Sequence, residues 1–96
     1  MKLSLFSYFD KSLSVFSAPI ALPTTQEEAK DYYLRMLINS DLEKLKGVEN
    51  YQAYYVGYFD DKSGDLIANK AVYLFDFREL FAQVRGSRQN EESKEV

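Results

Sequence analysis

One short pattern occurs twice in this chain and constrains its fold more than any other feature. Tyr-Phe-Asp-Lys-Ser at residues 8–12 recurs as Tyr-Phe-Asp-Asp-Lys-Ser at residues 58–63. In each copy an apolar, aromatic-rich run ends in a polar turn, and apolar residues resume after the turn, which is the pattern of a β-hairpin. The repeat therefore predicts two hairpins that frame the segment between them.

The strands of these hairpins follow from the apolar runs. The first hairpin is predicted to pair residues 2–9 with residues 13–18, ending at Pro19, because proline cannot donate a hydrogen bond to a strand ladder. The second is predicted to pair residues 51–59 with a strand within residues 66–75. Its turn contains Gly64, which can adopt positive φ at no steric cost, so a type I turn with a glycine bulge is expected.

The segment between the hairpins has the pattern of a helix. Thr24 with Glu27, or Thr25 with Glu28, offers a capping box in either of two registers. Apolar residues then recur at spacings of three and four, as on one face of a helix. These residues are Ala29, Tyr32, Tyr33, Met36 and Leu37. A second helical turn is predicted over residues 41–46, with Gly47 placed to end it.

A short C-terminal helix is predicted after the last strand. Asp76 and Glu79 form another capping box, and Phe77, Leu80 and Phe81 follow at helical spacing. The whole pattern predicts an α+β fold: a single four-stranded antiparallel sheet in ββαββ order, with one helix packed on one face and a short helix at the C-terminus. We expect one domain over residues 1–84 and a disordered polar tail over residues 85–96.

The amino-acid composition argues against several classes of function. The chain has no cysteine and no histidine, so thiolate nucleophiles, imidazole general bases and the usual zinc ligands are absent. Its four glycines are scattered, and none forms a phosphate-binding loop. We therefore predict that the protein is not an enzyme and holds no cofactor.

Acidic residues cluster in the second hairpin turn at Asp60, Asp61 and Asp65. Carboxylates could hold a hard cation, but this spacing does not match a calcium loop. Aspartate side chains commonly accept hydrogen bonds from nearby backbone amides in turns. We interpret the cluster as a solvated turn and predict no metal site.

The chain has no predicted membrane segment or secretory signal. Asp10 and Lys11 interrupt the N-terminal apolar stretch well before signal-peptide length, and no run approaches the length of a membrane span. The absence of cysteine fits the cytosol. The net charge is −3, from 12 basic and 15 acidic residues, so attraction to a polyanion through global charge is not expected.

Aromatic residues are the main candidates for a binding surface. By alternation, Phe6 and Tyr8 share one strand face, whereas Leu5 and Phe9 share the other, which we expect the helix to cover. The predicted uncovered face then carries Phe6, Tyr8, Tyr54 and Tyr58, with Lys2, Lys11, Lys62 and Lys70 near the strand ends. Such a face could stack unpaired bases, each stack contributing about 1–3 kcal/mol.

Two other interpretations fit the same aromatic face. An open tyrosine-rich surface can be buried by self-association or by a protein partner, and its residues can also be ordinary core. The excess of acidic over basic residues argues against a strong phosphate-binding surface. Residue chemistry alone therefore favours a homodimer or partner interface over base stacking.

Several motifs resemble a known viral family. They are Phe-Ser-x-x-Asp-Lys at residues 6–11, Ser-Ala-Pro at residues 17–19, and the block from residue 49 to residue 66 that contains Gly57, Asp60, Asp61 and Gly64. Together they resemble the small non-structural protein of gokushovirus-type microviruses, which are tailless phages with single-stranded DNA genomes. The resemblance covers about residues 3–75. The chain departs from it at residues 39–41 and 48–50, where relatives often carry prolines.

The resemblance implies a function that composition does not. The family is described as DNA-binding, so the chain is expected to be a non-enzymatic accessory protein that binds DNA, mainly single-stranded, during viral replication or the switch to single-strand synthesis in the host cytoplasm. The acidic composition argues against an arginine-rich packaging role, which needs many cationic contacts. The alternative is an interaction module, homodimeric or docked on a replication initiator or a host factor, with no DNA contact.

Overall fold

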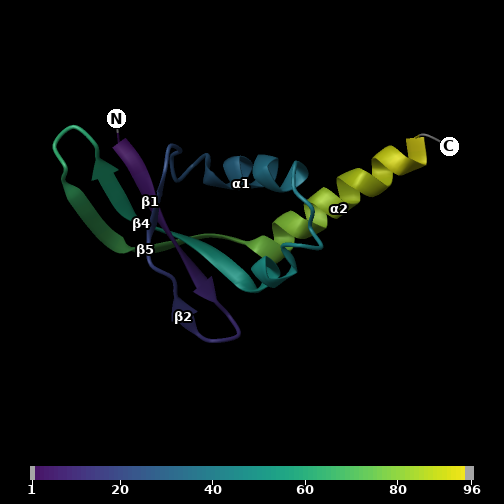
Figure 1. Cartoon of the computed structure of the whole chain (residues 1–96), viewed down its shortest axis with the longest axis horizontal. Coiled ribbons are helices and arrows are strands. Elements are labelled where there is room, and N and C mark those ends of the chain that lie inside the picture. Colours follow the sequence, from purple (N-terminus) through teal and green to yellow (C-terminus); the bar gives the residue numbers. More distant parts are fainter. Residues whose placement is uncertain (1, 95–96) are drawn as a thin grey trace.

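The fold combines a curled antiparallel sheet with two α-helices, which confirms the predicted α+β class (Figure 1). The computed structural model describes residues 2–94. The strands are β1 (Lys2–Asp10), β2 (Val15–Phe16), β3 (Ile20–Leu22), β4 (Tyr51–Asp60) and β5 (Leu66–Asp76). The helices are α1 (Ala29–Ile38), the short 3₁₀ helix η1 (Lys46–Asn50) and α2 (Phe77–Lys94).

The sheet places the two hairpins side by side. Its strand order is β2-β1-β4-β5, and β3 also pairs with β1, so β1 and β4 are the central strands. All pairings are antiparallel. The elements therefore follow one another as three strands, a helix, two strands and a helix, which is one strand more than predicted.

The extra strand arises because the first hairpin returns in two pieces. Between β2 and β3, Ser17 hydrogen-bonds to β1: its backbone N–H donates to the Tyr8 carbonyl at 2.8 Å, and its Oγ accepts from the Tyr8 N–H at 3.0 Å. Ser7 Oγ donates to the Ser17 carbonyl at 2.8 Å. Pro19 follows and lacks a donor. The single predicted strand over residues 13–18 is thus divided, and the ladder resumes at Ile20.

The two hairpin turns have matching geometry. The Asp10 carboxylate accepts from the Ser12 N–H, and the Asp60 carboxylate accepts from the Lys62 N–H, both at 2.9 Å. Four residues after each aspartate the backbone has positive φ: 56° at Ser14 and 78° at Gly64. The sequence repeat therefore encodes one turn type twice, with serine in the first copy where the second has glycine.

Replacing Ser14 with glycine should stabilise the fold. A side chain in the left-handed region costs roughly 1 kcal/mol, offset in part by the greater freedom of glycine in the unfolded chain. We expect Ser14→Gly to raise the free energy of unfolding by about 0.5 kcal/mol in urea titrations. The reverse change, Gly64→Ser, should lower it by a similar amount; equal stability of both variants and the wild type would contradict the shared geometry.

The predicted helix starts are present in modified form. Thr25 Oγ1 accepts a hydrogen bond from the Glu28 N–H at 3.1 Å, as the predicted capping box of Thr25 with Glu28 requires. This bond caps the turn that leads into α1 and not the first residue of α1 itself. Residues 42–45 form turns, with Asp41 Oδ1 accepting from the Glu43 N–H at 3.1 Å. Gly47 lies within η1 and does not end a helix there.

The C-terminal helix is longer than the sequence pattern predicts. α2 continues to Lys94, whereas a disordered tail was expected from residue 85, and residues 95–96 of that tail lie outside the described part of the chain. Most residues after 84 are good helix formers, so a helix already docked by its first turns extends at little cost. Arg85 also forms an ion pair with Glu49 in η1, at 2.6 Å.

The core lies between one face of the sheet and both helices. Phe6, Ala53 and Phe75 from the central strands and β5 are buried against residues of α1 and α2. The helical contributors are Ala29, Tyr33, Leu37, Phe77, Leu80, Phe81 and Val84. Because side chains alternate along a strand, the residues next to Phe6 point to the opposite face. In β5 the register shifts at Leu74, so Tyr73, which pairs with Tyr54, lies on that opposite face although Phe75 is in the core.

A β-bulge changes the alternation in β4. Phe6 pairs with Tyr55, but Leu5 pairs with Gly57, so Val56 is an extra residue in the ladder. Gly57 has φ 143° and is buried. The insertion places Tyr55 and Tyr58 on the same face, although their spacing of three would put them on opposite faces of a regular strand.

Candidate functional site

An aromatic row crosses the sheet face opposite the core. Phe9 in β1 pairs with Phe16 in β2, and Tyr54 in β4 pairs with Tyr73 in β5. Successive ring centroids lie 5.0 Å apart for Phe9 and Phe16, 5.1 Å for Phe16 and Tyr54, and 5.7 Å for Tyr54 and Tyr73. We call these four residues the aromatic row.

Both ends of the aromatic row are open to solvent. Phe16 and Tyr73, on the outer strands β2 and β5, are 51% and 49% exposed, whereas Phe9 and Tyr54, on the central strands β1 and β4, are partly buried. Large rings rarely gather on a solvent-facing surface without a binding role. The row therefore offers a stacking surface that spans four strands.

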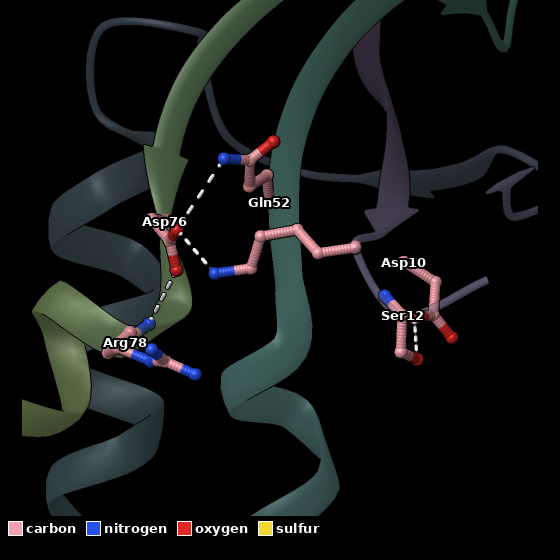
Figure 2. A network of polar contacts seen from close by, with 6 residues as sticks. Asp10, Ser12, Gln52, Asp76 and Arg78 are labelled. Carbon is pink, nitrogen blue, oxygen red and sulfur yellow. Dashed lines mark hydrogen bonds and ion pairs between the residues drawn. The ribbon is translucent and has the colours of Figure 1, made fainter. Parts of the chain in front are cut away.

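A polar network borders the row where the two hairpins meet (Figure 2). Lys11 Nζ, from the first turn, lies 2.7 Å from Asp76 Oδ2 at the end of β5. Gln52 Nε2 in β4 donates to the same oxygen at 3.5 Å, and Asp76 Oδ1 accepts from the Arg78 N–H at 2.9 Å. Asp76 thus caps the start of α2 while linking both hairpins.

Both positive and negative side chains lie near the row. Partial burial alone would raise the pKa of Asp76, but the Lys11 ammonium and the Arg78 and Gln52 donors outweigh it and hold that pKa below its ordinary value. Burial raises the pKa of Tyr73, and the nearby carboxylates of Glu79 and Asp76 raise it further. One lysine therefore lies beside the row, already paired, next to two carboxylates.

The lowered pKa of Asp76 makes part of the stability dependent on pH. The folded state favours the Asp76 carboxylate over the protonated acid. The carboxylate therefore contributes to the free energy of unfolding above the ordinary pKa near 3.8, and this contribution is lost as the pH falls through the lowered pKa of the folded state. Asp76→Asn keeps an acceptor for the Arg78 N–H and removes the charge. We expect the wild type to be more stable than Asp76→Asn near neutral pH, with the difference closing in thermal melts taken down to about pH 3; a constant difference would contradict the charged network.

The structure corrects the predicted positions of two site residues. Phe6 has an exposed fraction of 0% and lies in the core, and Tyr8 is partly buried on the same side, where its hydroxyl hydrogen-bonds to the Tyr33 hydroxyl. Burial raises the pKa of both tyrosines. The face assigned to Leu5 and Phe9 is the open one, because the helical aromatic residues pack on Phe6 and Phe75 instead.

The other six predicted site residues lie in several separate parts of the structure. Tyr54 lies in the aromatic row and Lys11 beside it. Tyr58 lies on the core side but beyond the helices, with the Lys2 Nζ 4.8 Å from its ring centroid. Lys62 and Lys70 are exposed, in the second turn and in β5. The eight predicted residues therefore do not form one surface.

Sequence reasoning missed Phe16 and Tyr73 and placed Phe9 on the covered face. Alternation gave no signal for choosing a face, because both parities of β1 are apolar. A cross-strand signal was available for Phe16, which lies at the spacing from its turn that pairs it with Phe9. It was not available for Tyr73, because regular pairing from the second turn would place Ala71 opposite Tyr54, and only a register shift within the hairpin brings Tyr73 there. The pairing of Phe16 with Phe9 therefore predicts half of the row without deciding which face the helices cover.

No further chemistry was found in the described residues, and no relative identifies the chain. Within residues 2–94, no group of three or more acidic, cysteine or histidine side chains could hold a metal ion. None of the helices described there is long and apolar enough to span a membrane. Comparison with protein-family models, curated proteins and solved structures found no match to this chain.

Proposed function

We propose that the protein is a non-enzymatic accessory factor that binds single-stranded DNA through the aromatic row during viral genome replication, in the host cytoplasm. The observation that carries the proposal is the row itself: four rings from four strands, with both end rings about half exposed. Both helices pack on the other face of the sheet, so the face that carries the row is free to receive a single strand of DNA. Unpaired bases can stack on such rings regardless of sequence.

The charge distribution defines the expected mode of binding. The chain carries a net charge of −3, and Lys11 beside the row is paired with Asp76. Few phosphates can then be neutralised, so affinity should come from stacking and should fall only weakly with salt. A duplex hides its base faces and should bind less well.

The test is a titration of a labelled single-stranded oligonucleotide, followed by fluorescence anisotropy. The variant Phe16→Ala/Tyr73→Ala removes the two most exposed rings of the row, and we expect it to weaken binding about tenfold or more. Tyr73→Phe keeps the ring and should bind like the wild type. Leu66→Ala is the matched control, because Leu66 is 69% exposed on the same face and is aliphatic.

Two outcomes would overturn the proposal. The first is absence of saturable binding to single-stranded DNA at low salt. The second is an equal loss of affinity in Leu66→Ala and in Phe16→Ala/Tyr73→Ala, which would show that the rings have no special role. Thermal melts of each variant confirm that the compared proteins are folded.

A second candidate function is supported by the carboxylates near Tyr73. Asp76 and Glu79 both raise the pKa of Tyr73, so negative charge lies close to one end of the row and would repel phosphate. Leu66, which is 69% exposed, adds apolar surface on the same face. This surface would suit a second copy of the chain, a replication initiator or a host replication protein.

Solution mass distinguishes the second candidate from the first. If the row is a homodimer interface, sedimentation should show a dimer in the wild type and a monomer in Phe16→Ala/Tyr73→Ala, without DNA. A wild-type monomer at all concentrations tested would exclude self-association through this face.

A further inference from the structure

A second hollow, separate from the aromatic row, lies beside the bulge on the core side of the sheet. It is a cavity of about 480 Å³ between the ends of β1, β4 and β5 and the segment that leads into α1. Tyr55 and Tyr58 contribute aromatic surface to it. Its volume is within the range of small-molecule sites, roughly 300–1,000 Å³.

The bulge creates the aromatic part of this cavity. Tyr55 pairs with Phe6 and Tyr58 pairs with Ser4, and Ser4 and Phe6 share a face of β1. Without the extra residue Val56, one of the two tyrosines would point to the other face. Bulges commonly redirect side chains next to binding sites, and this one brings two tyrosines to one hollow.

Polar groups complete the cavity wall. Asn69 and Gln26 supply amides that can donate and accept, and Glu27 supplies a carboxylate. All three are exposed and therefore free to orient toward a ligand. Lys2 lies at the same cavity with its ammonium 4.8 Å from the Tyr58 ring centroid. A stacking surface, hydrogen-bonding groups and a cation thus meet in one place.

We infer that this cavity holds the base of one unpaired nucleotide of the bound strand, with preference for guanine. The base would stack on Tyr58, while Lys2, which is exposed, leaves the ring to contact the phosphate. Guanine presents two adjacent donors on its Watson–Crick edge, which suit the two oxygens of the Glu27 carboxylate. The inference rests on the proposed function, because the nucleotide belongs to the single strand.

The test is titration of the full-length protein with each deoxynucleoside monophosphate and with deoxyribose 5-phosphate, followed by NMR. We expect saturable shifts with deoxyguanosine monophosphate at lower concentration than with the other bases. Tyr58→Ala and Asn69→Ala should each weaken this binding, and Glu27→Gln should remove the preference for guanine. Phe16→Ala/Tyr73→Ala should leave it unchanged, because the row lies on the other face.

The outcomes separate this inference from the proposed function. No saturable binding of any nucleotide, or an equal response to deoxyribose 5-phosphate, overturns the cavity assignment while single-strand binding through the row can persist. An unchanged response in both Tyr58→Ala and Asn69→Ala also overturns it. Nucleotide binding without single-strand binding would support the cavity and refute the proposed function.

Discussion

Gly57→Ala is expected to lower the free energy of unfolding by about 3 kcal/mol or more. The Gly57 backbone has φ 143°, which side chains rarely adopt, and a Cβ at this position would overlap the Ile67 carbonyl oxygen of β5. The neighbouring atoms are backbone, so they cannot move aside as a flexible side chain could. The loss combines backbone strain with displacement of a strand.

Substitutions at two other glycines distinguish backbone strain from displacement of a strand. Gly64 also has positive φ, 78°, but there is open space where its Cβ would lie, so Gly64→Ala should show backbone strain alone, about 0.5–1 kcal/mol. Gly47 has open space and no positive φ, so Gly47→Ala should be close to neutral. Urea unfolding of the three variants tests the ranking. A loss at Gly57 no larger than that at Gly64 would contradict the close approach of β4 and β5.

Phe6→Ala is expected to cost about 3–5 kcal/mol, because it removes a fully buried ring from a closely packed core. The Phe6 ring packs edge-on against Tyr33 and Tyr55, with centroids 6.2 Å and 6.3 Å away. Its removal leaves a cavity between α1 and the sheet. Urea denaturation followed by circular dichroism measures the loss.

Phe16→Ala is the matched control for the Phe6 prediction. The ring is the same size but is 51% exposed, so we expect a loss of about 1 kcal/mol or less. If Phe6→Ala were well tolerated and Phe16→Ala severe, the helices would cover the other face. The comparison therefore tests which sheet face is open as well as the core itself.

The turns and main strands could be predicted from the sequence because their signals are local. The Tyr-Phe-Asp repeat marks both hairpins, and Asp10 and Asp60 accept the turn hydrogen bonds that their position suggests. Aromatic and β-branched residues mark β4. Each of these features depends on a few neighbouring residues and on no tertiary contact.

The choice of face could not be predicted, because it depends on the bulge and on the helices together. Alternation groups Tyr54 with Tyr58, but Val56 interrupts the ladder and puts them on opposite faces. A glycine inside a strand is compatible with a bulge, but it does not show which neighbouring residue is the extra one. Phe6 and Leu5 are both apolar, so only the packing of Tyr33 and Phe81 decides which one is buried.

The length of α2 is a second limit of sequence reasoning. Residues after Val84 carry no apolar stripe, and a polar segment of this kind read alone suggests disorder. The helix persists because its first turns bury Leu80 and Phe81 and because Arg85 pairs with Glu49. Tertiary docking supplies the costly first turn, which the local pattern does not reveal.

Binding of single-stranded DNA to the aromatic row is tested most directly by an NMR titration of the labelled protein with a short single-stranded oligonucleotide. We predict that the ring resonances of Phe16, Tyr54 and Tyr73 shift together and saturate, while those of the core rings Phe75 and Phe81 do not move. Absence of shifts in the aromatic row at saturating oligonucleotide, or shifts confined to the helices, would contradict it.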